Sequence, residues 1–341
     1  MDHNFKYVFG PVPSRRLGRS LGVDLVPFKT CTYDCIYCQL GRTTCKTTER
    51  REYVPVADVL AELKARLAVS TPPDYITLSG SGEPTLHSGI GEIIAGIRKL
   101  TQIPIAVLTN GSLLINQAVQ QELGSADLII PSLDAGDDVI FQRINRPHAD
   151  IRFEAIVSGL AQFCTSYRGE VWLEVFLLGG ITDIDAEVAK IARQVKCICL
   201  TRVQLNTVAR PPAEDYAHPV PLKQMERYCG FFFPQAEVIV EHDAFPETLT
   251  AGGAESKDII ALLGRRPCTL KDIADGLGLH PTQVAKTLEH LRNDGKIIEQ
   301  RVDNRIYYEP LKQKPAIAKS ERAPAGHGNR VKDKIKDSQG T

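Results

Sequence analysis

The sequence predicts an α/β fold built on a parallel sheet. From residue 21 to about residue 245, short β-branched runs alternate with longer stretches that have the 3.6-residue period of an amphipathic helix. This alternation is typical of repeated strand–helix units, in which each helix connects two parallel strands. Six such strands fit either an incomplete barrel or an open sheet with helices on both faces.

The strands are expected where β-branched and large apolar residues cluster between turn signals, at residues 21–26, 75–78, 105–108, 128–131, 171–178 and 202–205, with a further strand at 237–240. The helices are expected where apolar residues recur three and four positions apart, at residues 56–68, 89–100, 115–122, 153–164 and 186–195.

After Gly253 the pattern changes. Helical segments at 257–263 and 281–294, with a short helix and turn at 270–278 between them, precede two strands, 296–300 and 305–309, that flank an Asp303-Asn304 hairpin signal. This order predicts a small winged helix-turn-helix domain at 254–310, after a larger domain at 1–250. The remainder, 311–341, is rich in Lys, Ala, Pro and Gly and is predicted to be a disordered basic tail.

The composition limits the compartments in which the protein is expected and the partners it is expected to bind. The formal net charge of the 341 residues is +0, which gives no overall sign of a nucleic-acid partner. The predicted winged helix is also neutral, so protein docking and nucleic-acid binding both stay open. No apolar run approaches the ~20 residues that cross a bilayer, and the N-terminus lacks the apolar stretch of a secretion signal. Nine cysteines, an odd number, indicate ligands or free thiols in the cytoplasm.

Polar residues follow most of the predicted strands, where parallel α/β folds bind their ligands. A cysteine loop follows the first strand and Asn206-Thr207 follows the sixth, while Glu174 interrupts the apolar fifth strand. A buried carboxylate is costly unless it is paired. The other strand ends lead into Ser79-Gly-Ser-Gly-Glu-Pro, Thr109-Asn-Gly and Ser132-Leu-Asp.

The loop Cys31-Thr-Tyr-Asp-Cys35-Ile-Tyr-Cys38 has the spacing C-x3-C-x2-C. Three close thiolates can each bind one iron of a [4Fe–4S] cluster and leave the fourth iron open for a small ligand. Zinc is one alternative, with Cys45 or a distant His as a fourth ligand, although zinc sites usually show a second Cys or His pair. Three buried thiols without a metal are the other alternative.

Cys31 to Cys38, with Tyr37 before the last cysteine, resembles the signature of the radical S-adenosylmethionine (SAM) superfamily over about residues 8–245. The resemblance implies a partial (β/α)6 TIM-type barrel and a [4Fe–4S] cluster on Cys31, Cys35 and Cys38. It also implies that SAM binds the open iron and is cleaved reductively to a 5′-deoxyadenosyl radical, with an external flavodoxin- or ferredoxin-like protein as electron donor.

The same resemblance implies a set of SAM-binding residues. Gly80-Ser-Gly82-Glu83-Pro84 is similar to the family's Gly-Gly-Glu-Pro segment, whose backbone carbonyls hold the SAM ammonium. Turn chemistry alone would also favour such residues in loops. No catalytic residue is assigned. The expected cofactor-binding residues are Tyr37, Gly80, Gly82, Glu83, Asn110, Ser132 and Asp134.

Two further segments are similar to the tRNA wyosine-synthesis enzyme, 4-demethylwyosine synthase, within that superfamily. They are the run around Arg15-Arg16 and the pair of segments 133–134 and 144–147. This similarity implies a tRNA substrate, selected or delivered by the winged helix. The chain has no cysteine before Cys31, where the tRNA enzyme carries a second cluster. A protein or small-molecule substrate is an alternative, and so is an iron–sulfur redox sensor that binds DNA through the winged helix.

Overall fold

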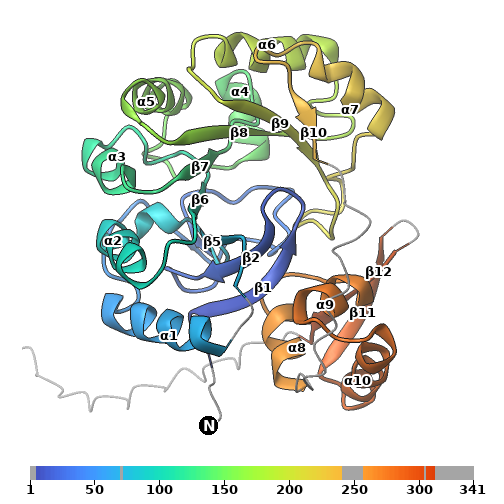
Figure 1. Ribbon diagram of the computed structural model, residues 1–341. Helices are drawn as coiled ribbons and strands as arrows, with labels where there is room; N and C mark the ends of the chain where they lie inside the picture. The colour runs from blue at the N-terminus through green and yellow to red at the C-terminus, as the bar shows by residue number, and fades with distance from the viewer. Residues whose placement is uncertain (1–4, 70–71, 240–255, 303–304, 312–341) are drawn as a thin grey trace, which may run out of the picture. The chain divides into compact units, whose positions relative to one another are not determined.

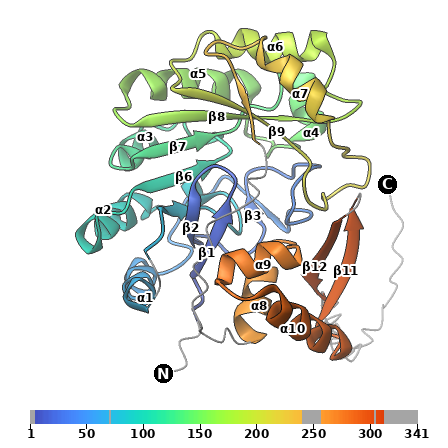
Figure 2. The same ribbon diagram turned by 45° about the vertical axis from the view of Figure 1, so that its right-hand side comes forward.

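A computed structural model describes residues 5–69, 72–239, 256–302 and 305–311. Its main feature is a curved sheet of eight strands in the order β1-β2-β5-β6-β7-β8-β9-β10 (Figures 1 and 2). β1 is antiparallel to β2, and each later strand is parallel to its neighbour. The strands are β1 (Val8–Ser14), β2 (Gly18–Val23), β5 (Tyr75–Leu78), β6 (Ile105–Thr109), β7 (Leu128–Pro131), β8 (Glu170–Leu177), β9 (Arg202–Thr207) and β10 (Glu237–Val238).

This sheet confirms the parallel α/β prediction, and it is an incomplete barrel. Among the described strands, β1 and β10 each pair with one neighbour and not with each other. All six predicted parallel strands are present, and the further strand at 237–238 joins them. β1 was not predicted. Its Pro11 and Pro13 argue against a central strand, but an edge strand tolerates proline, and a bulge lies between Phe9 and Val12.

The five predicted barrel helices are all present and lie along the outer side of the sheet (Figure 1). Their amphipathic sequences explain this placement: in the second of them, Ile90, Ile93, Ile94 and Ile97 recur at helical spacing and are fully buried. The helices are α1 (Val56–Val69), α2 (Ile90–Leu100), α3 (Gln117–Leu123), α5 (Phe153–Ser166) and α6 (Asp185–Val195).

Three helical segments were not predicted: α4 (Asp138–Ile144), α7 (Leu222–Cys229) and the 3-10 turn η1 (Pro84–Leu86). Each has at most eight residues, too few for the apolar repeat to stand out from its surroundings. The barrel region also contains two short strands. β3 (Thr30–Cys31) and β4 (Cys45–Lys46) pair with each other around the cysteine loop.

We call residues 256–311 the C-terminal segment. It contains α8 (Ser256–Leu263), α9 (Leu270–Leu277), α10 (Pro281–Asn293) and an antiparallel pair of strands, β11 (Ile297–Val302) and β12 (Arg305–Pro310). The predicted order of three helices and two strands is therefore confirmed. The Asp303-Asn304 turn and the tail at 312–341 lie outside the described residues.

Capping residues explain where α9 begins and ends. Thr269 and Asp272 form a capping box at its start, and Gly278 ends it with a positive φ of 65°. The apolar core of the C-terminal segment, which includes Ile273 and Val284, also takes in Val12 of β1. Residues up to Leu311 accordingly form one compact unit.

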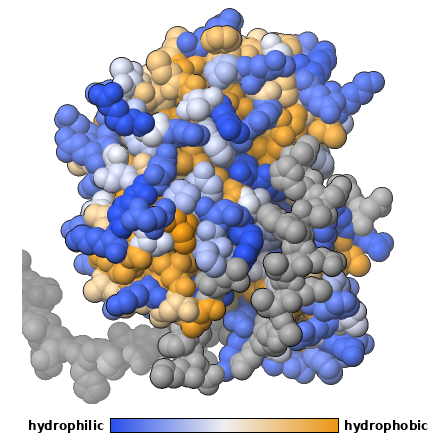
Figure 3. Space-filling view, viewed as in Figure 1, coloured by the Kyte–Doolittle hydropathy of each residue, from blue (hydrophilic) through white to orange (hydrophobic). Residues whose placement is uncertain are grey.

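In the described part of the chain, no helix is long and apolar enough to span a membrane. The face shown in Figure 3 carries hydrophilic side chains interspersed with smaller hydrophobic patches. The apolar side chains that stabilise the fold are therefore buried between the sheet and its helices. The carboxyl ends of the parallel strands lie together at one edge of the sheet, where the cysteine loop begins.

Candidate functional site

The loop after β2 carries the three predicted ligand cysteines, all half-buried. Burial raises the pKa of the Cys31 thiol to about 12, and Glu83 and Cys38 add to the rise. Burial also raises the pKa of Cys35, and the neighbouring Cys31 and Cys38 raise it further. The three sulfurs are thus close enough for their ionised forms to repel one another. A bound iron cluster, which takes thiolates as ligands, relieves that repulsion.

A four-iron cluster fits this loop better than a single zinc ion does. Each thiolate of a cubane binds its own iron, whereas one zinc ion draws all its sulfur ligands to ~2.3 Å. Within the described residues, no three His, Cys, Asp or Glu side chains are gathered as a single ion requires. Cys45, one candidate for the fourth ligand in the zinc alternative, is exposed. The donor set fits a [4Fe–4S] cluster with one open iron.

Backbone and side-chain contacts tie the cysteine loop to the segment that follows α4. The Asp34 amide donates to the Asn145 carbonyl at 3.0 Å. The side-chain amide of Asn145 is buried, lies 3.5 Å from the Cys35 sulfur and donates to Asp134 at 3.0 Å. Residues 144–147 thus hold the loop that carries the cysteines.

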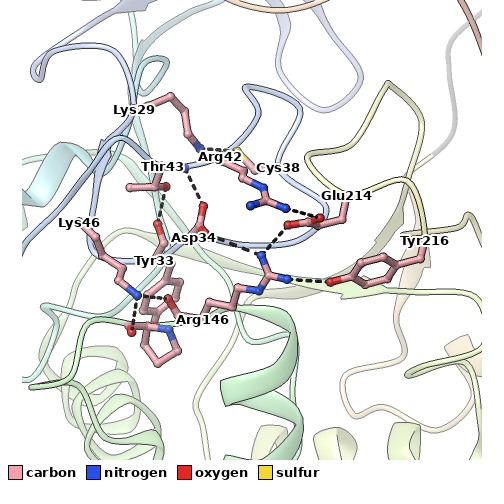
Figure 4. Close-up of polar contacts among 11 residues, drawn as sticks. Lys29, Tyr33, Asp34, Cys38, Arg42, Thr43, Lys46, Arg146, Glu214 and Tyr216 are labelled. Carbon is pink, nitrogen blue, oxygen red and sulfur yellow. Dashed lines mark hydrogen bonds and ion pairs between the residues drawn. The ribbon is translucent and has the colours of Figure 1, made fainter.

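An ion-pair network closes over the same loop (Figure 4). Glu214 accepts hydrogen bonds from Arg146 at 2.6 Å and Arg42 at 3.0 Å, and its side chain is 9% exposed. Arg146 also donates to the Tyr216 hydroxyl at 2.7 Å and lies 3.8 Å from Asp34. The hydrogen bond from Arg146 lowers the pKa of Glu214. Glu214 therefore stays ionised and bridges two arginines that flank the cysteine loop.

Lys29 directly precedes the loop and contacts one of its sulfurs. The residue is 3% exposed and has a positive φ of 59°. Its amide donates to the Ser81 carbonyl at 2.6 Å, and its ammonium donates to the Cys38 sulfur at 3.2 Å (Figure 4). A buried cation therefore lies beside the sulfur of one of the three predicted ligand cysteines.

The loop after β5 lies against the cysteine loop at a distance that only glycine permits. A Cβ atom at Gly82 would stand 1.8 Å from the carbonyl oxygen of Thr30. Gly80 has a φ of +115°, and a Cβ there would stand 2.0 Å from a carboxylate oxygen of Asp24. Both glycines are thus required by close approach and, for Gly80, by backbone conformation.

Glu83 is buried and links this loop to the end of β6. Its carboxylate accepts hydrogen bonds from the Thr85 hydroxyl at 2.6 Å, the Thr109 hydroxyl at 2.7 Å and the Asn110 amide at 2.7 Å. The Asn110 side chain in turn donates to the Thr32 hydroxyl at 2.7 Å. The ends of two strands are in this way bonded to the cysteine loop.

The ends of β7 and β8 meet around Asp134. Its carboxylate accepts hydrogen bonds from the Tyr37 hydroxyl and, at 3.0 Å, from the Phe176 amide. Burial raises the pKa of Asp134 to about 6. The Tyr37 ring stacks on Phe176 with ring centres 4.1 Å apart. Ser132, two residues earlier, bridges to Glu174 of β8. Tyr37 is therefore fixed by two independent contacts.

A cavity of about 390 Å³ opens beside the cysteine loop. Its size is in the range of small-molecule sites. Five predicted site residues line it: Cys31, Cys38, Tyr37, Gly80 and Gly82. The others are not in its lining and stand behind it, namely Cys35, Glu83, Asn110, Ser132 and Asp134.

The cavity also contains an ion pair between Arg16 and Glu174, whose side chains are 14% and 15% exposed. The sequence indicated that the Glu174 carboxylate needs a partner, and Arg16 supplies it. Sequence reasoning missed Lys29, Asp34 and Glu214. Lys29 adjoins the cysteine motif, a position that could have drawn attention to it, whereas nothing around Glu214 indicates its role.

Comparison with known proteins agrees with this geometry. The Radical SAM superfamily matches residues 25–194. A UPF0026 protein of Methanocaldococcus jannaschii is 33% identical over 309 residues, 88% of this chain and 94% of that protein. A GTPase Obg of Brachyspira hyodysenteriae is 40% identical over 307 residues, 89% of this chain; the chain spans 45% of that protein. The crystal structure of a radical SAM methyltransferase from Sphaerobacter thermophilus has a TM-score of 0.50 at 18% identity, covering 64% of this chain and 65% of that one.

The structural likeness, at such low identity, bears on the fold, and it agrees with the partial barrel predicted from the sequence. The superfamily match covers the cysteine loop and the strand ends that surround it. The relative from M. jannaschii extends the similarity through the C-terminal segment to most of the chain. The chain therefore belongs to the UPF0026 proteins of the radical SAM superfamily, and it is an iron–sulfur enzyme whose cofactors are a [4Fe–4S] cluster and S-adenosylmethionine.

Proposed function

We propose that Cys31, Cys35 and Cys38 hold the [4Fe–4S] cluster and that the adjoining cavity receives both SAM and the molecule that the enzyme modifies. The observation that carries this proposal is that two of the three cysteines line a cavity of about 390 Å³. When bound, the cluster supplies an electron that cleaves SAM to methionine and a 5′-deoxyadenosyl radical, which abstracts a hydrogen atom from the substrate.

The residues of the chain bind and orient SAM. Gly80 and Gly82, which line the cavity, bring backbone carbonyls within reach of the SAM ammonium. Tyr37 offers an aromatic surface to the adenine and is held in place by Phe176. The carboxylate and ribose hydroxyls of SAM are assigned to the strand-end residues Asn110, Ser132 and Asp134, and Glu83 is assigned to the SAM site as part of the segment 80–84. Asn110 is hydrogen-bonded to Glu83, and Asp134 is hydrogen-bonded to Tyr37, which lines the cavity; this proximity to the cavity wall supports the assignment.

Two residues of the cavity wall orient the substrate. The ion pair of Arg16 and Glu174 keeps both polar groups in fixed positions, and Asn206 lies 3.5 Å from the Glu174 carboxylate. Because the carboxylate and the guanidinium are mostly buried and paired with each other, they can offer directed hydrogen bonds without leaving an uncompensated buried charge. This end of the cavity is the substrate end in the proposal.

The electron comes from an external flavodoxin- or ferredoxin-like protein, as the family resemblance implies. The proposed compartment is the cytoplasm, where reducing conditions keep cysteines as thiols. The free state of the described cysteines agrees with that compartment.

The C-terminal segment is proposed to be a winged helix-turn-helix, on the basis of its three helices followed by a two-stranded sheet. The proposed division is a radical SAM barrel at 1–250, the winged helix at 254–310 and a basic tail at 311–341. The proposed substrate class is tRNA, on the basis of the resemblance to 4-demethylwyosine synthase. Lys286, His290 and Arg292 of α10 are the candidate contacts to phosphates.

The test of the cluster assignment is anaerobic reconstitution with iron and sulfide, then reduction with dithionite in the presence of SAM. The wild-type protein is expected to release 5′-deoxyadenosine. Cys35→Ala is expected to lose the brown absorbance and the product, whereas the exposed Cys197→Ala serves as the matched control. Normal iron content in Cys35→Ala would overturn the ligand assignment. A clustered protein that binds DNA but never cleaves SAM would favour the redox-sensing regulator instead.

The tRNA proposal has a separate test. Nucleosides from purified tRNA are compared by mass spectrometry between cells with and without the gene, and the proteome is compared in parallel. Loss of one modified nucleoside, restored by the wild-type gene and not by the Cys35→Ala gene, would support tRNA. A changed protein modification with unchanged tRNA would reject it.

A further inference from the structure

The cavity is strongly basic away from the cysteines. Its lining includes five arginines and Lys29, against one carboxylate, that of Glu174. Lys29 is engaged by the Cys38 sulfur and Arg16 by Glu174. The other basic lining residues are Arg15, Arg210, Arg265 and Arg266.

Two of these arginines come from the C-terminal segment. Arg265 bonds to the Asp24 carboxylate of the barrel at 2.9 Å, and Arg266 donates to the Pro13 carbonyl at 3.3 Å. The Tyr307 hydroxyl donates to the carbonyl of Ala209, next to Arg210. The C-terminal segment thus forms part of the cavity wall.

Arg210 and Arg266 each have an N–H donor that is not used in a hydrogen bond within the described structure. In the described structure, the Nε–H groups of both are buried and make no hydrogen bond. Arg210 donates one hydrogen bond to the Gln39 side chain at 3.3 Å and lies 3.8 Å from Asp272, beyond hydrogen-bond distance; among the described residues Arg266 forms no ion pair. Burial lowers the pKa of Arg210, and the nearby positive charge of Arg266 lowers it further.

The two half-buried guanidiniums repel each other, and the Asp272 carboxylate interacts with both, so one positive charge of the pair is left for a bound anion to neutralise. Their donors form planar forks that match the oxygens of a phosphate group, which carries about two negative charges and three acceptor oxygens. A ligand with a single carboxylate would supply only about half the negative charge of such a phosphate group. SAM contains no phosphate, so a phosphate bound here would belong to another molecule.

We propose that Arg210 and Arg266 bind a phosphate group of the substrate, with the C-terminal segment as one wall of the substrate site. This inference rests on the proposed function in one respect, that the cavity holds the substrate. A phosphorylated small molecule and the backbone of an RNA both offer phosphate oxygens to such forks, although each phosphodiester of RNA carries a single negative charge. The experiment below separates these two sources.

The test uses the full-length, cluster-loaded protein under anaerobic conditions, with inorganic pyrophosphate as the probe and isothermal titration calorimetry as the measurement. The wild-type protein is expected to bind pyrophosphate, and binding should weaken at least about tenfold in Arg266→Gln and in Arg210→Gln. Arg227→Gln, which removes an exposed arginine on α7, is the matched control and should bind like the wild type. Equal affinity in all four proteins, or no binding to the wild type, overturns the proposal.

Arg266→Lys guards against loss of folding, because it keeps the charge and removes only the planar fork; an affinity between those of wild type and Arg266→Gln is expected. Malonate is the second probe, and malonate binding as tight as pyrophosphate binding would reject a phosphate site. If purified tRNA displaces pyrophosphate, the phosphate source is RNA; if it does not, the source is a small molecule. Binding is read without SAM cleavage, so failure here is distinguishable from failure to release 5′-deoxyadenosine.

Discussion

Replacing Lys29 with methionine is expected to shift the reduction potential of the cluster to more negative values. The Lys29 ammonium lies 3.2 Å from the Cys38 sulfur, and the residue is 3% exposed, so water screens its charge poorly. At that distance a full negative charge would interact with it by about 5 kcal/mol at an effective dielectric constant of ~20. The electron that reduces the cluster is shared over the whole cubane, so roughly a quarter of this energy is expected, or on the order of 60 mV for a one-electron couple.

The sign follows from the charge. A cation stabilises the more negative, reduced cluster, so its removal favours the oxidised state. The assay is a redox titration of the reconstituted protein followed by electron paramagnetic resonance. Lys29→Gln, which keeps an N–H donor but no charge, separates the hydrogen bond from the charge and should lie between Lys29→Met and wild type. Lys190→Met on α6 is the control. An unchanged or raised potential in Lys29→Met would refute the reasoning.

Three further outcomes are expected. Gly82→Ala forces a Cβ to within 1.8 Å of the Thr30 carbonyl oxygen. We therefore expect the free energy of unfolding to fall by about 1–3 kcal/mol and the protein to lose most of its bound iron. A normal iron content would contradict this prediction. Glu214→Gln weakens the hold on Arg146, so a chelator should remove iron faster than from the wild type, and an equal rate would speak against the network. Thr269→Ala removes the capping box of α9 and should cost about 1 kcal/mol in urea unfolding, a value that an unchanged midpoint would exclude.

The sheet was predictable because its signal is local. A buried parallel strand such as β7, Leu-Ile-Ile-Pro, is apolar along its whole length, and a helix such as α2 repeats its isoleucines at helical spacing. β1 was missed because its prolines mimic a loop, and its strand character depends on pairing with β2. A local sequence pattern therefore predicts helices and strands in which buried residues recur at a regular spacing. It misses strands that form only because they pair with a neighbouring strand.

The candidate site divides in the same way. The cysteines share a motif of eight residues, so their convergence is encoded locally. Glu214 reaches Arg42 across 172 positions and Arg146 across 68, and nothing near it in the sequence announces either partner. Lys29 is a different case, since its burial beside a sulfur depends on how the loops after β2 and β5 meet. Residues that act by long-range pairing become visible only in three dimensions.

The contact between Asp24 and Arg265 joins positions 241 residues apart, and it bears on the order in which the protein is assembled. Closing so long a loop costs more chain entropy than a local contact does, so we expect this contact to form late in folding. The strands and the cysteine loop can therefore come together while the wall that carries Arg265 and Arg266 is still absent. Iron delivery would then meet an open cysteine loop during biogenesis, whereas the substrate would meet the finished cavity.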